Sequence, residues 1–153
     1  MVVLLAEDNM ADQEIARRAM AEHEMKVNLL IVNDGVEAIN YLTRRGKFSS
    51  HEAAPRPDII LLDINMPMMD GIQTLREIKE NPDLKPIPVI MLTTSNLERD
   101  VESSYNLGAN AYITKPMDFN MFSHVLSEIK MFWLKTATLP SIRPDEVIGE
   151  EWS

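Results

Sequence analysis

The chain has 153 residues, 45% of them hydrophobic and 25% charged, which is typical of one folded domain. Its formal net charge of −9 argues against binding to nucleic acid or to an anionic membrane through a basic surface. The lack of cysteine excludes disulfides, iron–sulfur clusters and thiol catalysis. Because the N-terminal apolar run is too short for a signal peptide and no window is long enough for a membrane span, we expect a soluble cytoplasmic protein.

Five short apolar runs alternate with segments whose apolar residues have helical spacing. The uninterrupted run Ile59–Leu62 is typical of a strand buried on both faces of a parallel sheet. Strand and helix alternating five times predict right-handed crossovers, with helices on both faces of that sheet. The predicted strands are residues 2–6, 27–32, 58–63, 88–93 and 111–114. The predicted helices lie around residues 15–20, 36–42, 72–79, 97–105 and 118–134.

Turn signals support these divisions. Two Asp-Gly pairs mark the starts of the second and third helices, and an Asn-Pro pair marks the end of the third. The pairs are Asp34-Gly35, Asp70-Gly71 and Asn81-Pro82. We expect residues 46–57 to form a polar surface excursion. We expect a folded domain over residues 1–135, followed by a polar tail at 136–153 that is poorly ordered unless it docks.

Acidic, hydroxyl and amine side chains follow four of the predicted strands. They are Glu7 and Asp8 after the first strand, Asp63 after the third, Thr93 to Ser95 after the fourth, and Thr114 to Pro116 after the fifth. Ligands of open α/β sheets bind beyond the carboxyl ends of the strands, so these groups predict a site at one edge. Alone, Asp8 or Thr94 is equally well explained as a helix N-cap.

The chemistry of these residues predicts phosphoryl transfer. Three neighbouring carboxylates raise one another's pKa values, and a divalent cation removes that conflict. Mg²⁺ prefers hard oxygen ligands and completes its shell with water and phosphate. Lys115 adds a mobile positive charge and Thr93 a short donor for a phosphoryl group. Asp63 is then the candidate nucleophile, which would form an aspartyl phosphate.

The same residues resemble the motifs of the receiver domains of two-component response regulators, over about residues 2–135. The motifs are Glu7-Asp8, LLDINMPMMDG around Asp63, LTTS at 92–95 and YITKP at 112–116, at the family's usual intervals. The resemblance implies a flavodoxin-like (βα)5 doubly wound parallel sheet with strand order 2-1-3-4-5. It also implies a phosphoacceptor signalling protein rather than an enzyme, with only phosphoryl acceptance and slow self-dephosphorylation as chemistry.

The resemblance assigns roles around the phosphorylation site. Asp63 would accept a phosphoryl group from a phosphohistidine of a sensor histidine kinase, with Mg²⁺, or in its place Mn²⁺, as cofactor. Asp8, Asp63 and the backbone carbonyl of Asn65 would bind the metal directly, and Glu7 would act through water. Lys115 would pair with the phosphate, and the Lys115–Pro116 peptide bond would be cis.

Two further residues would act as a switch. Thr93 would bind the phosphoryl oxygen and move on activation, and Tyr112 would follow it inward, although a half-buried core aromatic explains Tyr112 equally well. At the next position Thr94 stands where the family often has the smaller Ala or Gly. A larger side chain there would hinder water, so we expect slow self-dephosphorylation.

The last predicted helix carries two apolar stripes rather than one. The first stripe, Phe119, Phe122, Leu126, Ile129 and Trp133, can face the sheet. The second, Met121, Val125 and Phe132, calls for another burial partner. We expect a homodimer through this helix and the TATLP segment at 136–140. The alternative is that the tail folds back over the second stripe.

Softer motifs narrow the resemblance to the receivers associated with bacterial and cyanobacterial phytochromes. They are FW before a TLP ending, the loop near 46–57 and NPDLKPIPV. They favour a phytochrome-type kinase as phosphodonor and output through the receiver's own surface, without a DNA-binding domain. Two alternatives stay open. A Mg²⁺-dependent aspartyl-phosphate phosphatase would need an acid where Asn65 stands, and a phosphorylation-independent binding module usually lacks a member of the cluster.

Overall fold

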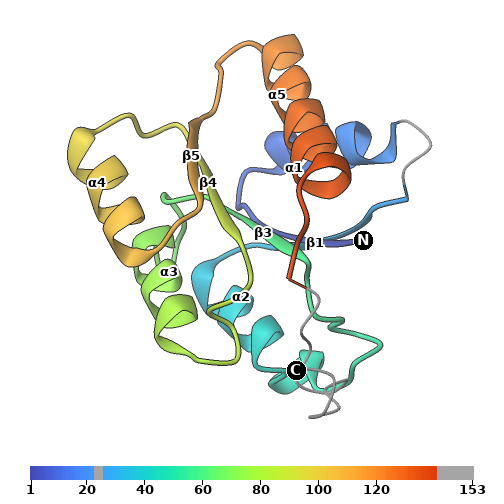
Figure 1. The fold of residues 1–153 in the computed structure, drawn as a ribbon, viewed down its shortest axis with the longest axis vertical. Coiled ribbons are helices and arrows are strands. Elements are labelled where there is room, and N and C mark those ends of the chain that lie inside the picture. The colour runs from blue at the N-terminus through green and yellow to red at the C-terminus, as the bar shows by residue number, and fades with distance from the viewer. Residues whose placement is uncertain (23–25, 141–153) are drawn as a thin grey trace.

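The computed structural model describes residues 1–22 and 26–140, and it forms a five-stranded parallel sheet between two layers of helices (Figure 1). The strands are β1 Val2–Ala6, β2 Asn28–Val32, β3 Ile59–Leu62, β4 Val89–Thr93 and β5 Ala111–Thr114. The helices are α1 Met10–Ala21, α2 Gly35–Leu42, α3 Gly71–Glu80, α4 Glu98–Leu107 and α5 Phe119–Met131. A short 3₁₀ turn, Gly46–Phe48, follows α2, and a π-helical turn, Phe132–Thr136, extends α5.

The sheet has the order β2-β1-β3-β4-β5, with every neighbouring pair parallel, so the predicted flavodoxin-like topology is confirmed. The central strand β3 is buried along its whole length, as its unbroken apolar sequence predicts. Its neighbour β4 is buried in the same way. These two strands therefore form the rigid centre from which the loops at the carboxyl edge extend.

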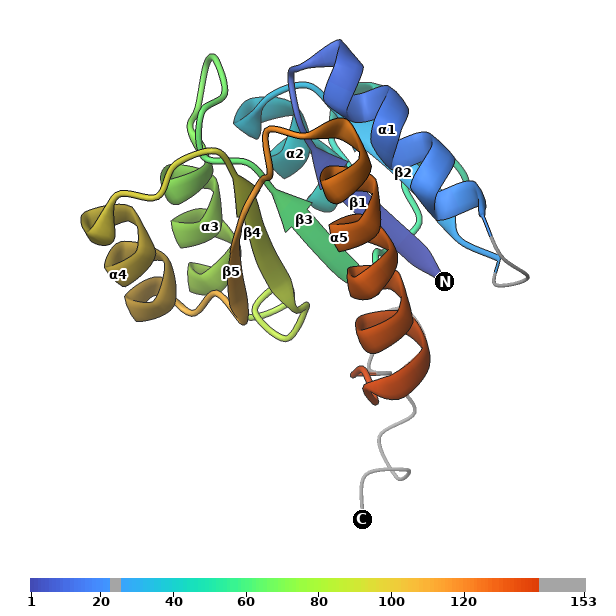
Figure 2. The same cartoon turned by 90° about the horizontal axis from the view of Figure 1, so that it is seen from above.

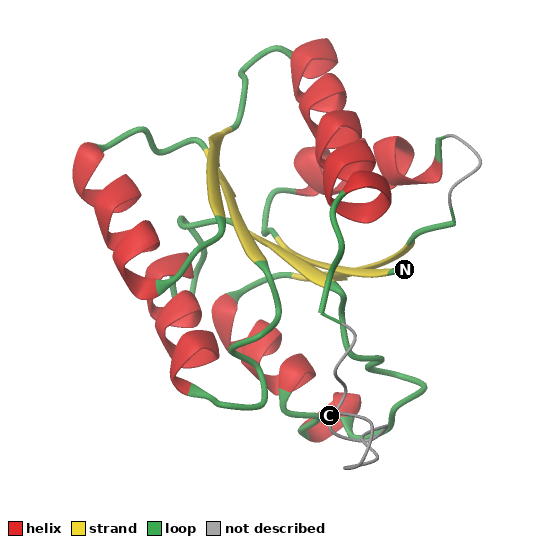
Figure 3. Ribbon diagram, in the orientation of Figure 1, coloured by secondary structure: helices red, strands yellow, loops and turns green. Residues whose placement is uncertain are grey.

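Each face of the sheet has its own core. Helices α1 and α5 cover one face and pack against Val3, Leu5 and Leu61, whereas α2 and α3 cover the other face, with α4 beside α3 (Figures 1 and 3). The side chains of β3 alternate between the two cores, because successive strand residues point to opposite faces. Both helical layers thus depend on the same central strand.

Aspartate N-caps fix where two of the helices start. The carboxylate of Asp34 accepts a 2.7 Å hydrogen bond from Glu37 N, and that of Asp70 accepts a 2.8 Å bond from Gln73 N. Both caps were predicted from the Asp-Gly pairs, and Asn81 ends α3 as expected. The start of α3 also requires glycine at position 71 for a steric reason. A Cβ there would lie 2.0 Å from the Asp63 carbonyl oxygen, so α3 starts in direct contact with that residue.

A buried lysine joins the ends of α1 and α5, which lie side by side (Figure 2). The Lys130 side chain on α5 is fully buried, and its ammonium donates a 2.9 Å hydrogen bond to the Met20 carbonyl and another to the Glu22 carbonyl. Burial lowers the pKa of Lys130, while Glu22 acts in the opposite direction. The carbonyls at the end of α1 therefore find their donor on another helix.

Two predictions about local structure are wrong, and a third is only partly right. Phe119 is 54% exposed and does not face the sheet, because helical side chains tilt toward the N-terminus and it is the first residue of α5. The loop at 46–57 is not only a surface excursion, since Ala54 is 1% exposed within the core under α2. The described residues contain no cis peptide bond, so the Lys115–Pro116 bond is trans, the isomer that X-Pro bonds intrinsically favour.

The outer surface of α5 only partly matches the predicted second stripe. Met121 and Phe132 are 61% and 54% exposed, whereas Val125 packs in part against the core formed with α1. Beyond residue 140, the predicted tail lies outside the described residues. Within the described part of the chain, no helix has the length and apolar character needed to cross a membrane.

Candidate functional site

Four strand ends bring the predicted site residues to one edge of the sheet. Backbone hydrogen bonds continue past the strands there: Glu7 N donates to Val32 O at 3.0 Å, Asp63 N to Ala6 O at 3.1 Å, and Lys115 N to Thr93 O at 2.7 Å. The main chain next to these side chains is therefore as well fixed as the sheet itself. Glu7, Asp63, Thr93 and Lys115 are all buried at this edge.

The ammonium of Lys115 lies at the centre of the cluster. It donates hydrogen bonds to Glu7 Oε1, to Asp12 Oδ2 at 2.9 Å and to Asp63 Oδ2 at 3.5 Å. The second oxygen of Asp63 accepts a 2.8 Å bond from Ile64 N. One cation thus compensates three carboxylates, two of which are almost fully buried.

Burial and charge shift the pKa values of this cluster in ways that suit a cation site. Burial raises the pKa of Glu7 to about 7 and the charge of Asp63 adds to that rise, while hydrogen bonds from Lys115 and from Asn9 N oppose it. Burial alone would lower the pKa of Lys115, but its bonds to Glu7 and Asp12 and the charge of Asp63 outweigh burial and raise it. Lys115 therefore stays protonated. A further cation nearby would stabilise the charged form of Glu7.

The carboxylates fit a divalent metal ion. Glu7, Asp8 and Asp63 each offer one oxygen, and these oxygens lie within 4.8 Å of one another. Hard oxygen donors so arranged, with Asp8 exposed to solvent that can supply further ligands, match the preferences of Mg²⁺ and Mn²⁺. Asn65, predicted to contribute its carbonyl, is exposed two residues beyond Asp63.

A chain of hydrogen bonds connects the predicted switch residues. The buried hydroxyl of Thr93 accepts a 3.3 Å bond from Ser95 N, and the Tyr112 hydroxyl donates a 2.7 Å bond to Ser95 O. The Ser95 hydroxyl in turn donates to Asp100 Oδ2 at 2.6 Å, in the first turn of α4. Burial raises the pKa of Tyr112, so its phenol stays protonated as a donor. Ser95 thus links the site to α4 and β5.

The structure removes one alternative explanation of the cluster. The N-cap of α1 is Asn9, whose side chain accepts a 2.9 Å bond from Asp12 N, and α4 starts after Leu97 without a side-chain cap. Asp8 and Thr94 are therefore not helix caps, and both residues are exposed at the edge where the other site residues meet.

Two residues of the site were not predicted. Asp12 reaches Lys115 from the first turn of α1, and its signal in the sequence is an acidic residue four positions after Asp8, close to the predicted edge. Gln13 is buried, and its amide donates to Glu7 O at 2.6 Å and to Asn33 Oδ1 at 2.8 Å, so it supports the Glu7 backbone. A lone glutamine in an amphipathic helix gives no such signal in the sequence.

The comparison with protein families agrees with this geometry. Residues 3–127 match the model of the response regulator receiver domain. The chain belongs to the receiver-domain family. This family consists of signalling proteins.

Similar proteins place the receiver near those of phytochrome systems. It is 43% identical to the response regulator Rcp1 of Synechocystis over 140 residues, covering 92% of this chain and 93% of Rcp1. The structure of the phosphorylated cyanobacterial phytochrome response regulator RcpA matches with a TM-score of 0.88 and 44% identity, over 92% and 98% of the two chains. The Mn²⁺-bound form of Rcp1 matches with a TM-score of 0.86 and 43% identity, over 92% and 99%.

Proposed function

We propose that this receiver accepts a phosphoryl group on Asp63 from the phosphohistidine of a sensor kinase, in a reaction that requires Mg²⁺. The observation that carries the proposal is the meeting of three carboxylate oxygens within 4.8 Å of one another, with the Lys115 ammonium 3.5 Å from Asp63 Oδ2. A bound Mg²⁺ would neutralise charge on the phosphoryl oxygens. Glu7, Asp8, Asp63 and the carbonyl of Asn65 would hold it.

The residues of the chain would perform the transfer as follows. An Asp63 carboxylate oxygen attacks phosphorus, the new P–O bond forms, and the P–N bond to the donor imidazole breaks, leaving its electron pair on nitrogen. Lys115 then exchanges part of its contact with Asp63 for a phosphoryl oxygen, while Glu7 and Asp12 hold its ammonium in place. The Thr93 hydroxyl donates to a second phosphoryl oxygen.

The switch would follow from the bonds around Ser95. When Thr93 turns toward the phosphoryl group, it gives up its bond from Ser95 N, and the loop that ends in α4 moves with it. Tyr112 follows because its hydroxyl is bonded to Ser95 O. The signal would thus appear on the surface formed by α4, β5 and α5.

The donor we propose is a phytochrome-type histidine kinase. Two similar proteins support this choice: RcpA is a cyanobacterial phytochrome response regulator, and a response regulator in red light signalling of R. palustris is 33% identical with a TM-score of 0.83. Phosphorylation by an ATP-dependent kinase implies a cytoplasmic location. We also propose a homodimer through the exposed part of α5, with Met121 and Phe132 central and Val125 at the margin.

Acetyl phosphate with Mg²⁺, followed by intact-mass measurement, tests the phosphorylation proposal. We expect one added phosphate on the wild type, none on Asp63→Asn, and none on the wild type in EDTA. The matched control is Asp70→Asn, which changes an exposed N-cap of α3 and should be phosphorylated normally. Phosphotransfer from a panel of purified kinases then identifies the donor.

Other outcomes of the same measurement would support the other candidates. Continuous release of inorganic phosphate from acetyl phosphate without accumulation of the modified protein would indicate a phosphatase. No mass change in any condition would indicate a binding module. An exposed Asn65 in place of an acid argues against the phosphatase, because the general acid needed for turnover is missing there.

A further inference from the structure

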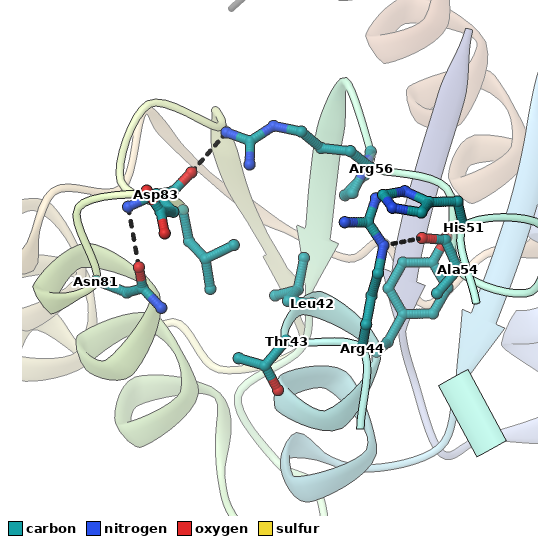
Figure 4. Close-up of a pocket in the computed structure, with 11 residues that line it drawn as sticks. Leu42, Thr43, Arg44, His51, Ala54, Arg56, Asn81 and Asp83 are labelled. Carbon is teal, nitrogen blue, oxygen red and sulfur yellow. Dashed lines mark hydrogen bonds between the residues drawn. The ribbon is translucent and has the colours of Figure 1, made fainter. Parts of the chain in front are cut away.

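Lys115 is anchored differently from two arginines at the opposite end of the sheet. Around the cavity of about 480 Å³ beside the end of α2, Arg44 Nε donates a 3.2 Å hydrogen bond to Ala54 O, and Arg56 donates a 2.6 Å bond to Asp83 O (Figure 4). Both of these acceptors are backbone carbonyls. The three hydrogen bonds of the Lys115 ammonium go to carboxylates instead. Because a carboxylate carries a full charge that a second cation can also use, the contacts of Lys115 can be exchanged for a metal ion.

Two of the carboxylates that hold Lys115 are also candidate metal ligands. Glu7 and Asp63 belong with Asp8 to the three clustered carboxylates, whose oxygens lie within 4.8 Å of one another. Both oxygens of Glu7 already have a donor, since Oε1 accepts from Lys115 and Oε2 accepts a 3.1 Å bond from Asn9 N. A divalent cation that shares the charge of these carboxylates weakens their attraction for the ammonium and repels it. Lys115 therefore needs another counterion when a metal ion is bound.

Asp12 is placed to be that counterion. Its Oδ2 lies 2.9 Å from the Lys115 ammonium, closer than Asp63 Oδ2 at 3.5 Å. Among the residues that the structure describes, Asp12 is not one of the three clustered carboxylates that can share one ion. The first turn of α1 fixes its position, because Asp12 N donates a 2.9 Å bond to the N-cap side chain of Asn9. Asp12 can thus keep its bond to Lys115 while a metal ion occupies the neighbouring carboxylates.

We propose that Asp12 is a positioning residue that holds Lys115 away from Asp63 and thereby sets the affinity of the site for its divalent cation. Without the charge of Asp12, the ammonium would move onto Asp63 Oδ2 and oppose a metal ion at the same carboxylate. The inference deepens the proposed function, on which it rests for the use of the site in phosphoryl transfer. Its test measures metal binding directly, so the two can fail separately.

The test titrates the full chain with Mn²⁺ and follows free Mn²⁺ by electron paramagnetic resonance, with Mg²⁺ as competitor. Asp12→Asn should raise the Kd for Mn²⁺ about tenfold, equivalent to about 1.4 kcal/mol. Asp12→Glu keeps a carboxylate and should bind Mn²⁺ as the wild type does. The matched control is Glu14→Gln, which removes one negative charge from an exposed position of the same helix, where Glu14 pairs with Arg17 and Arg18. It should leave the Kd unchanged.

A double-mutant cycle shows whether Asp12 acts through the lysine. In the Lys115→Met background, Asp12→Asn should change the Kd for Mn²⁺ far less, because no ammonium is left to move onto Asp63. The comparison of Asp12→Glu with Asp12→Asn does not need this background, and it decides even if Lys115→Met fails to fold. With acetyl phosphate, Asp12→Asn should need more Mg²⁺ for half-maximal phosphorylation and should reach the wild-type rate at saturating Mg²⁺.

Three results would overturn the proposal. The first is an equal Kd for Mn²⁺ in Asp12→Asn and the wild type, and the second is a wild type that binds no Mn²⁺. The third is an equal loss of affinity with and without Lys115, since the charge of Asp12 would then act on the metal ion directly. A wild type that binds Mn²⁺ but gains no phosphate from acetyl phosphate would refute phosphoryl acceptance at Asp63 instead, while the titrations would still decide the role of Asp12.

Discussion

The ammonium of Lys115 lies 3.5 Å from Asp63 Oδ2, yet its closer hydrogen bonds go to Glu7 and Asp12. Lys115 therefore lies near the candidate phosphoryl acceptor, while its closer hydrogen bonds go to other carboxylates. The arrangement leaves the Asp63 carboxylate partly compensated and still reactive, while the lysine is anchored by residues that are not themselves phosphorylated.

Replacing Lys115 by methionine should destabilise the metal-free protein at neutral pH by about 3 kcal/mol, since removing one member of a buried ionic cluster leaves the others uncompensated. Mg²⁺ should recover part of this loss by binding among the same carboxylates. Urea unfolding in EDTA and in Mg²⁺ measures both effects. Lys135→Met, at an exposed position, is the control, and equal unfolding free energies for the two variants would contradict the argument.

Replacing Thr94 by alanine should accelerate loss of the phosphoryl group from Asp63. The Thr94 side chain is exposed directly after the buried Thr93, where its bulk can obstruct the approach of water. The decay is followed by intact mass after acetyl phosphate has been removed. Thr138→Ala, exposed and far along the chain, should decay as the wild type does, and an unchanged rate for Thr94→Ala would show that bulk at this position has no role.

Replacing Phe132 by glutamate should convert a wild-type dimer into a monomer. The Phe132 ring is 54% exposed at the end of α5, and burying a charge in its place should raise the dimer Kd about tenfold or more. Light scattering at tens of micromolar protein gives the mass. Tyr105→Glu removes a 50% exposed ring from α4 and should remain dimeric. A monomeric wild type under these conditions would refute the proposed interface.

The Tyr41 phenol should make stability fall at high pH. Burial raises the pKa of Tyr41, and the charge of Arg44 offsets only part of that rise. Above about pH 10 the unfolded chain releases this proton while the folded chain retains it, so the folded state binds more protons and its stability decreases as the pH rises.

Tyr41→Phe should remove this decline. It should also cost about 1 kcal/mol near neutral pH, because the 2.7 Å hydrogen bond to Pro55 O is lost. Urea unfolding at a series of pH values compares the slopes. Tyr105→Phe, on the exposed surface of α4, should keep the wild-type slope; if Tyr41→Phe keeps it as well, burial of Tyr41 is not the cause.

The sheet could be predicted almost to the residue, because strands buried on both faces leave unbroken apolar runs such as Ile59–Leu62. The edge with Glu7, Asp63 and Lys115 followed from the same runs, since polar groups directly after buried strands must meet. In each case an apolar run changes abruptly to a polar residue. That change marks the end of the strand and places the polar side chain at the edge of the sheet.

Other contacts had no comparable signal. Gln13 and Lys130 are polar residues within helices, and their burial depends on where carbonyl groups of other elements lie in space. Ala54 enters the core because the 46–57 loop turns back under α2, where the Tyr41 hydroxyl bonds to Pro55 O. Local pattern cannot reveal such contacts, because they are decided by tertiary packing.

Lys130 also sets a sequence of events during synthesis. The carbonyl of Met20 receives its donor from a residue 110 positions later in the chain. At about 5–20 residues per second, the ribosome needs roughly 5–20 seconds to add that stretch. During that interval the carbonyls at the end of α1 lack the hydrogen bonds from Lys130. The ends of α1 and α5 can therefore pack together only once α5 has been synthesised.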